Sequence, residues 1–150
     1  MKILLAYDGS RFADAAVDQV LARPWPDGTE VRLVTAVERV VTVGSTHGLE
    51  GYASFGERLG AQMREEAYRQ IVRALDRFRA RPDLGTTYDI RDGEVKGALL
   101  EAIREWGPDL VVAGSHGKTA LERLFLGSVS HALVSHAPCS VEIVKVPRAA

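Results

Sequence analysis

The sequence predicts a single α/β domain built around an open, mostly parallel sheet. Short apolar runs alternate along the chain with longer segments of helical periodicity, which is the pattern of β/α units. The length of 150 residues suits one domain and no shift in composition marks a boundary, so residues 1–150 are assigned to one domain. A chain of this length buries roughly 70% of the surface that its unfolded form exposes, so its core needs neither disulfides nor metal.

Two strands and the helix between them are predicted before residue 38. Residues 2–7 (KILLAY) are apolar without alternation, which is typical of a central strand covered on both faces. Ser10 is a suitable N-cap for the following helix, and Pro24 and Pro26 end it. A second strand is predicted over residues 31–37 (VRLVTAV).

Residues 38–56 show no consistent periodicity and contain four glycines, so we expect a long loop there. A connection of this length is uncommon inside a compact domain and is either mobile or functional. The next segment has the clearest helical pattern in the chain, and its apolar stripe is expected to pack against the core rather than line a binding site. The stripe comprises Leu59, Met63, Ala67, Ile71, Ala74 and Phe78.

The second half of the chain continues the alternation of strands and helices. The predicted elements are a polar edge strand over 86–90, a helix from Val95 to Trp106 ended by Gly107-Pro108, a central strand over 109–113, a short helix over 128–136 and a last strand over 139–146. The five strands and their crossings indicate an open α/β sheet.

Charge and cysteine content restrict the class of function. The 19 basic and 20 acidic residues give a formal net charge of −1, so the basic excess of a nucleic-acid binder is missing. The apolar run at residues 1–7 is too short for a signal peptide core or a membrane span. The single cysteine, Cys139, cannot form an intramolecular disulfide. We expect a cytoplasmic protein whose partners include neither nucleic acid nor a membrane.

The most informative segment is residues 113–129 (AGSHGKTALERLFLGSV), directly after a predicted central strand. Gly114 and Gly117 would let the backbone approach a ligand closely, and consecutive amides there can form an anion-binding nest. Gly127 and Ser128 then open a helix whose unpaired amides and positive dipole end attract phosphate. Each glycine alone suits an ordinary turn or helix start, whereas both elements around one loop indicate a phosphate site.

Better-known catalytic and nucleotide motifs do not fit this chain. Gly117-Lys118-Thr119 resembles the end of a Walker A loop, but two residues rather than four separate Gly114 from Gly117. Neither G-x-G-x-x-G nor G-x-S-x-G occurs. The four histidines show no metal-ligand spacing with acids or cysteines; they are His47, His116, His131 and His136. No catalytic residue and no metal site made by protein side chains alone is predicted.

The spacing of the glycines is similar to that of a known family. Two residues separate Gly114 from Gly117, and nine separate Gly117 from the pair Gly127-Ser128. This spacing matches the G-x2-G-x9-G-[ST] nucleotide motif of the universal stress protein (UspA-like) family, in its ATP-binding branch. Residues 2–10, 109–117 and 127–146 also resemble that family's first strand with its acidic loop, fourth strand, and last helix and strand. The resemblance implies a Rossmann-like, adenine nucleotide alpha hydrolase-like fold: five parallel strands in the order 3-2-1-4-5, with helices on both faces and a ligand crevice between strands one and four.

The same resemblance implies a site for ATP, with Mg²⁺ accompanying the nucleotide. Asp8 falls on the acidic position that holds the ribose hydroxyls, and Lys118 and Arg123 are candidates to add positive charge near the phosphates. The other implied ATP-binding positions are Ala6, Ala36 and Val37 near the adenine, Ala113, Gly114, His116 and Gly117 at the phosphate turn, and Gly127, Ser128 and Val129, which would bind phosphate through backbone amides and the Ser128 hydroxyl.

The function implied by the resemblance is a non-enzymatic, ATP-binding stress-response module. Nucleotide occupancy would change the surface offered to a protein partner. An ATPase or nucleotidyl-transfer enzyme on the same fold is the alternative, weakened because residues 8–11 read DGSR where related enzymes carry H-I-G-H or S-G-G-x-D-S. A nucleotide-free scaffold of the same family is a third possibility, against which the intact motif counts.

The last predicted strand, from Cys139 to Val146, suits the edge of the sheet. Its apolar residues are interrupted by Glu142 and Lys145, unlike those of the central strands. An unpaired strand edge invites pairing with another chain. The family resemblance implies a homodimer through this strand, in which the two-fold-related edges pair antiparallel.

Overall fold

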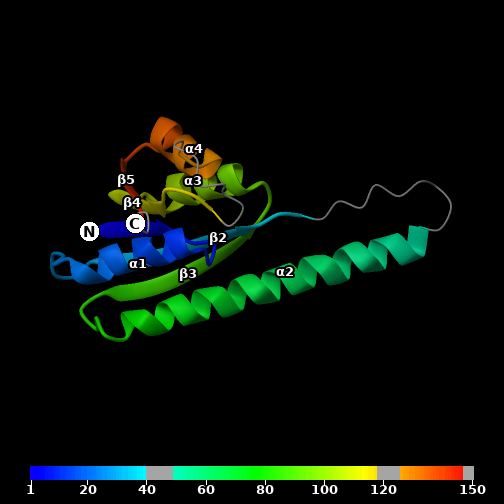
Figure 1. Cartoon of the computed structure of the whole chain (residues 1–150), viewed down its shortest axis with the longest axis horizontal. Helices are drawn as coiled ribbons and strands as arrows, with labels where there is room; N and C mark the ends of the chain where they lie inside the picture. The colour runs from blue at the N-terminus through cyan, green and yellow to red at the C-terminus, as the bar shows by residue number, and fades with distance from the viewer. Residues whose placement is uncertain (40–48, 118–125, 147–150) are drawn as a thin grey trace.

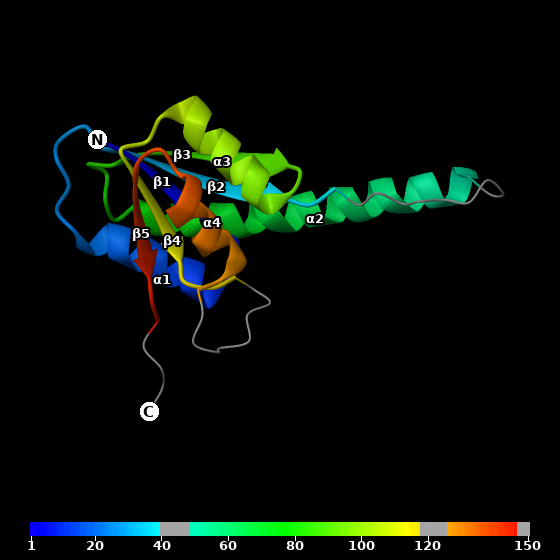
Figure 2. The same ribbon diagram turned by 90° about the horizontal axis from the view of Figure 1, so that it is seen from above.

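The computed structural model describes residues 1–39, 49–117 and 126–146, including their side chains except those of 49–54. Its five strands form one parallel sheet in the order β3-β2-β1-β4-β5, with helices on both faces, as Figures 1 and 2 show. The expected α/β fold and strand order are therefore confirmed. Within the described segments, no helix is long and apolar enough to cross a membrane.

The elements follow one another in strict alternation, and the chain crosses to the other half of the sheet only after β3. Their bounds are β1 Lys2–Ala6, α1 Arg11–Ala22, β2 Glu30–Val37, α2 Leu49–Phe78, β3 Gly85–Asp92, α3 Val95–Trp106, β4 Leu110–Gly114, α4 Ser128–His136 and β5 Ser140–Val144. The strands predicted to be central from their uninterrupted apolar runs, β1 and β4, lie inside the sheet.

The hydrophobic core lies in two layers, one on each face of the sheet. Ile3 and Leu5 pack with α1 and α2, whereas Leu4 packs with α3 and α4. Successive side chains of a strand point to opposite faces, so one apolar run supplies both layers. All three side chains are fully buried, as a strand covered on both faces requires.

The predicted loop over residues 38–56 is wrong in its second part, because α2 begins at Leu49. Residues 40–48 lie outside the described part of the chain. The N-terminal part of α2 extends well beyond the sheet (Figure 1), so it has no core to pack against and no apolar stripe to reveal it. A helix already nucleated by packing at its other end propagates by adding one hydrogen bond per residue, even through glycines at 51, 56 and 60.

The predicted N-cap of α1 is confirmed. The buried Ser10 has extended backbone angles and its Oγ accepts a hydrogen bond from the amide of Ala13 at 3.2 Å. At the far end of α3, Gly107 adopts a left-handed conformation with φ of 61°, which ends that helix as predicted.

Removing the cap hydroxyl should destabilise the fold. We expect Ser10→Ala to lower the free energy of unfolding by about 1 kcal/mol, because one amide at the start of α1 loses its partner. Urea denaturation followed by circular dichroism measures this change. Ser135→Ala, on the exposed side of α4, is the matched control and should alter stability by less than about 0.5 kcal/mol. Equal effects of the two substitutions would contradict the capping role.

Candidate functional site

One cavity of about 740 Å³ opens beside the carboxyl ends of β1, β2 and β4. This is the place where the strand order reverses, between β1 and β4, and where open α/β sheets bind ligands. The described positions implied by the sequence resemblance all line it: Ala6, Asp8, Ala36, Val37, Ala113, Gly114, His116, Gly117, Gly127, Ser128 and Val129. The other two, Lys118 and Arg123, lie outside the described residues.

Asp8 lies at the entrance from β1 into α1. Its Oδ1 accepts a hydrogen bond from the amide of Ser10 at 3.0 Å, which holds the carboxyl group in place. A Cβ added to Gly117 would lie 3.0 Å from Asp8 Oδ2. The carboxylate therefore lies directly against the turn that follows β4, and the absence of a side chain at Gly117 makes this contact possible.

Gly114 has a structural reason to lack a side chain that the sequence did not reveal. A Cβ there would lie 2.6 Å from the carbonyl carbon of Phe12 and 2.7 Å from its oxygen. The backbone at the start of α1 therefore fills the space above Gly114. Close packing of α1 on β4 is therefore sufficient by itself to require this glycine.

The amide of Gly127 is engaged within the protein. It donates to the carbonyl oxygen of Ser115 at 2.8 Å, so a contact between this amide and a phosphate would have to share or replace that bond. A Cβ at Gly127 would lie 3.2 Å from both Ser115 O and His116 Cα. Gly127 thus joins the start of α4 to the turn after β4, and its own contribution to the site is close packing.

The start of α4 supplies the amides that face the cavity. Gly127 is the N-cap and makes no side-chain capping bond, and the first hydrogen bond inside the helix runs from His131 N to Gly127 O. Ser128 and Val129, which both line the cavity, are therefore in the first turn, where amides have no intrahelical partner. The buried Ser130 donates its hydroxyl to Gly114 O at 2.7 Å and ties the helix to β4.

His116 carries a polar atom without a partner. Its Nδ1 lies 3.0 Å from Ser115 Oγ, and its ring packs against that of Phe12 at a centroid distance of 5.1 Å. The Nε2 atom is buried and has no hydrogen-bond partner among the described residues. A buried nitrogen of this kind is costly unless a ligand or water satisfies it, and His116 lines the cavity.

The sequence prediction missed the wall of the cavity that α2 supplies, formed by Gln62, Met63, Glu66, Ala67 and Gln70. Met63 and Ala67 belong to the stripe expected to pack in the core, and for Met63, which is 37% exposed, that prediction is wrong. Helical periodicity identifies the side of a helix that faces the sheet. It does not show where helix and sheet separate to leave a cavity.

Tyr7 makes two hydrogen bonds that fix the end of β1 to its neighbours beneath the cavity. Thr35 Oγ1 donates to Tyr7 O at 2.5 Å and thereby joins the ends of β2 and β1. The Tyr7 hydroxyl donates to Asp14 Oδ1 at 2.9 Å. Burial, together with the nearby Asp14 carboxylate, raises the pKa of the Tyr7 phenol well above its ordinary value, so the hydroxyl remains a donor.

The residues that line the cavity include both apolar and acidic side chains. Val95 and Leu99 of α3 contribute apolar side chains, and Asp8, Glu38 and Glu66 contribute acidic ones. The helix start and the turn after β4 provide backbone donors. Such a cavity suits a flat apolar group, a hydroxylated group near Asp8, and an anion at α4.

The chain belongs to the universal stress protein family, whose sequence profile matches residues 1–145. A relative from Thermus aquaticus, described as a universal stress protein in the QAH/OAS sulfhydrylase 3' region, is 32% identical over 148 residues, which cover 95% of this chain and 97% of the relative. The fold is also that of the universal stress protein UspA from Lactobacillus plantarum, with a TM-score of 0.79 at 19% identity over 96% of this chain and 97% of that one.

Two further structures of the same fold contain adenine nucleotides. One is a universal stress protein in complex with cAMP, with a TM-score of 0.63 and 20% identity over 98% of both chains. The other is an Arabidopsis thaliana family member with AMP bound, with a TM-score of 0.56 and 16% identity over 98% of this chain and 92% of that one.

Proposed function

We propose that this protein binds ATP together with Mg²⁺ in the cavity beside β1 and β4, and that it acts in the cytoplasm as a non-enzymatic stress-response module. The observation that carries this conclusion is that three features lie together where the strand order reverses between β1 and β4. They are the cavity and, among the described residues, the start of α4 without a side-chain cap and the His116 Nε2 atom without a hydrogen-bond partner. Nucleotide occupancy would change the surface presented to a protein partner.

Each part of the nucleotide has a matching chemical surface. The adenine would lie near Ala36 and Val37, where the lining is apolar. The ribose hydroxyls would donate to the carboxylate of Asp8. The phosphates would accept hydrogen bonds from the first amides of α4 and from His116 Nε2. Phosphate oxygens and a carboxylate are also the ligands that Mg²⁺ prefers.

The two nucleotide-containing relatives support the choice of ligand class. Both hold a ligand built from adenine, ribose and phosphate. Their bound ligands carry one phosphate, whereas the glycine motif of this chain resembles that of the family's ATP-binding branch. ATP with Mg²⁺ is therefore our proposal for this chain within the broader class of adenine nucleotides.

The ligand class can be tested by titration calorimetry with Mg·ATP and with NAD. We expect Mg·ATP to bind more tightly, because the cavity offers one ribose acid and one phosphate-binding helix start. Mass spectrometry of the denatured, purified protein should also detect ATP, ADP or AMP carried from the cells. Equal or tighter binding of NAD would contradict the proposed ligand. Release of phosphate over many turnovers per minute would contradict the non-enzymatic role.

The ribose contact can be isolated with Asp8→Asn. Asparagine retains an acceptor for the amide of Ser10 but loses the charge, so the local turn should persist. We expect about tenfold weaker binding of ATP and nearly unchanged binding of inorganic triphosphate, since the proposed partner of Asp8 is the sugar. Equal losses for the two ligands would show that Asp8 acts on the phosphates instead.

The homodimer implied by the family is proposed to form through β5. This strand pairs only with β4 among the described strands and lies at the edge of the sheet. The carbonyl of Val144 accepts from Ser115 N, so Val144 faces β4 and the backbone groups of Ile143 face outward. Ile143→Pro should therefore remove an outward donor and weaken association through this edge.

A further inference from the structure

The opposite edge of the sheet is formed by β3, which is eight residues long. The amides of Gly85 and Gly93 donate to Thr29 O and Val37 O. Odd-numbered residues of β3 thus direct their backbone groups toward β2, and the even-numbered residues direct theirs outward. No described strand lies beyond this side, so the edge presents a row of backbone donors and acceptors ready to pair.

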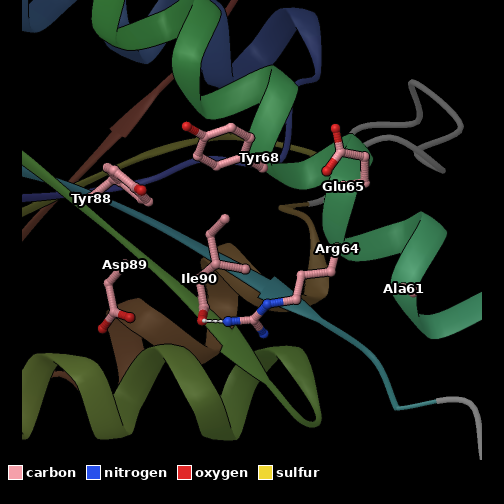
Figure 3. A pocket seen from close by; sticks show the side chains of 7 residues that line it. All are labelled: Ala61, Arg64, Glu65, Tyr68, Tyr88, Asp89 and Ile90. Atoms are coloured by element: carbon pink, nitrogen blue, oxygen red, sulfur yellow. Dashed lines mark hydrogen bonds between the residues drawn. The ribbon is translucent and has the colours of Figure 1, made fainter. Parts of the chain in front are cut away.

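A shallow groove of about 610 Å³ runs between this edge and α2, as Figure 3 shows. Tyr68 of α2 and Tyr88 of β3 meet there with ring centroids 6.0 Å apart, and they are 44% and 46% exposed. Val72, one turn further along α2, is 42% exposed. The flank of α2 beside the strand edge therefore offers apolar side chains in addition to the open backbone groups.

We propose that the β3 edge pairs antiparallel with β3 of a second copy of this chain, about a two-fold axis at Ile90. The charges of the strand are complementary to themselves in this register. Asp89 lies directly opposite Arg91 of the second copy, and Arg91 opposite its Asp89. Moving the axis to Asp89 or to Arg91 would instead place like charges opposite each other, which is unfavourable.

The local geometry agrees with this register. The backbone groups of residues 89 and 91 point toward β2. Residue 89 of one copy and residue 91 of the other are therefore opposite each other without hydrogen bonds between their backbones, an arrangement in which side chains approach most closely. Ile90 meets Ile90 of the second copy on the other face. Arg64 donates to Ile90 O at 3.4 Å, as the dashed line in Figure 3 marks. A carbonyl oxygen accepts two hydrogen bonds, so this contact leaves room for the partner strand.

The residues next to Asp89 and Arg91 would add contacts between the two copies without placing like charges opposite each other. Tyr88 lies opposite Asp92 of the second copy. In each chain Arg64 contacts both carboxylate oxygens of Asp92 at 2.7 Å and neutralises its charge. Within one chain Arg91 donates to Asp89 at 2.7 Å and to Glu105 at 2.6 Å, so its guanidinium is already oriented on the α3 side of the sheet. The Asp89–Arg91 pairs of the two copies would then join into one network of alternating charge. The exposed Tyr68 and Val72 would be covered by the α2 flank of the second copy.

Charge swapping tests the register in full-length protein that carries Ile143→Pro to remove pairing through β5. We expect this background to dimerise, and Asp89→Lys or Arg91→Glu added singly to weaken dimerisation about tenfold or more. An equimolar mixture of the two variants should dimerise again, because the lysine introduced into one variant then faces the glutamate introduced into the other, and the remaining Arg91 faces the remaining Asp89. Asp27→Lys, an equal charge change at the exposed turn before β2, should have no effect. Analytical ultracentrifugation measures the association of all five samples.

A distance measurement tests the same pairing while β5 is intact. Spin labels at Thr87→Cys, in a chain carrying Cys139→Ala, should lie about 20 Å apart, since each is three residues from the axis. Pairing through β5 alone would separate the labels by nine strand spacings, or about 43 Å. A monomeric background, single variants that still dimerise, or only the longer distance would overturn the proposal. A partner peptide occupying the edge would likewise leave this chain unpaired with itself.

Discussion

Gly114→Ala is expected to lower the free energy of unfolding by about 3 kcal/mol, at the upper end of the range for overpacked positions. The added methyl group would lie 2.6 to 2.7 Å from three atoms of Phe12, two of which are backbone atoms. Phe12 has little room to move, because Ser10 caps the same helix and His116 packs on the Phe12 ring. Urea denaturation monitored by circular dichroism gives the change directly.

Gly60→Ala provides the matched control for this substitution. Gly60 lies in α2, and a Cβ there would have no neighbouring atom within 4 Å. The same chemical change should therefore stabilise the protein by up to about 1 kcal/mol, because alanine has the higher helix propensity. An unchanged unfolding midpoint for Gly114→Ala would show that α1 can move away from β4, and the close packing inferred at Gly114 would be wrong.

Gly127→Val is expected to weaken ATP binding by a factor of about 100, compared with about threefold to tenfold for Ser128→Ala. The backbone angles of Gly127, φ −59° and ψ 153°, suit any residue, so valine causes no conformational strain. Its side chain would instead displace Ser115 and His116, which lie 3.2 Å from the Cβ position. The turn and the start of α4 would then no longer face one phosphate group together.

Titration calorimetry with Mg·ATP measures both affinities, and thermal unfolding establishes that each variant is folded. Gly127→Ala should give an intermediate loss, because one methyl group requires only a small displacement of the turn. Ser128→Ala, in contrast, removes a single hydroxyl group from an exposed position at the cavity. A larger effect of Ser128→Ala than of Gly127→Val would place the phosphates against side chains and would contradict the proposed site.

Much of the candidate site was predictable because its positions follow strand ends. Asp8 follows β1, and Gly114 ends β4; carboxyl ends of adjacent parallel strands meet at one edge of the sheet. That β1 and β4 are neighbours was implied by the family resemblance and not by the strand patterns, and the structure confirms it. The roles of the glycines were less predictable, since a missing side chain can serve a helix, a neighbouring turn or a ligand. At Gly114 the helix is responsible, and at Gly127 the turn.

The amino-acid sequence alone determined the alternation of strands and helices, the buried central strands and the cap at Ser10, because each depends on local periodicity or on a hydrogen bond within one turn. Tertiary structure alone decided that α2 begins as early as Leu49, that Met63 lines a cavity, and that the amide of Gly127 is occupied by Ser115. These features depend on where distant segments approach or separate. Such distances are set by the packing of the whole sheet and its helices, and no local pattern encodes them.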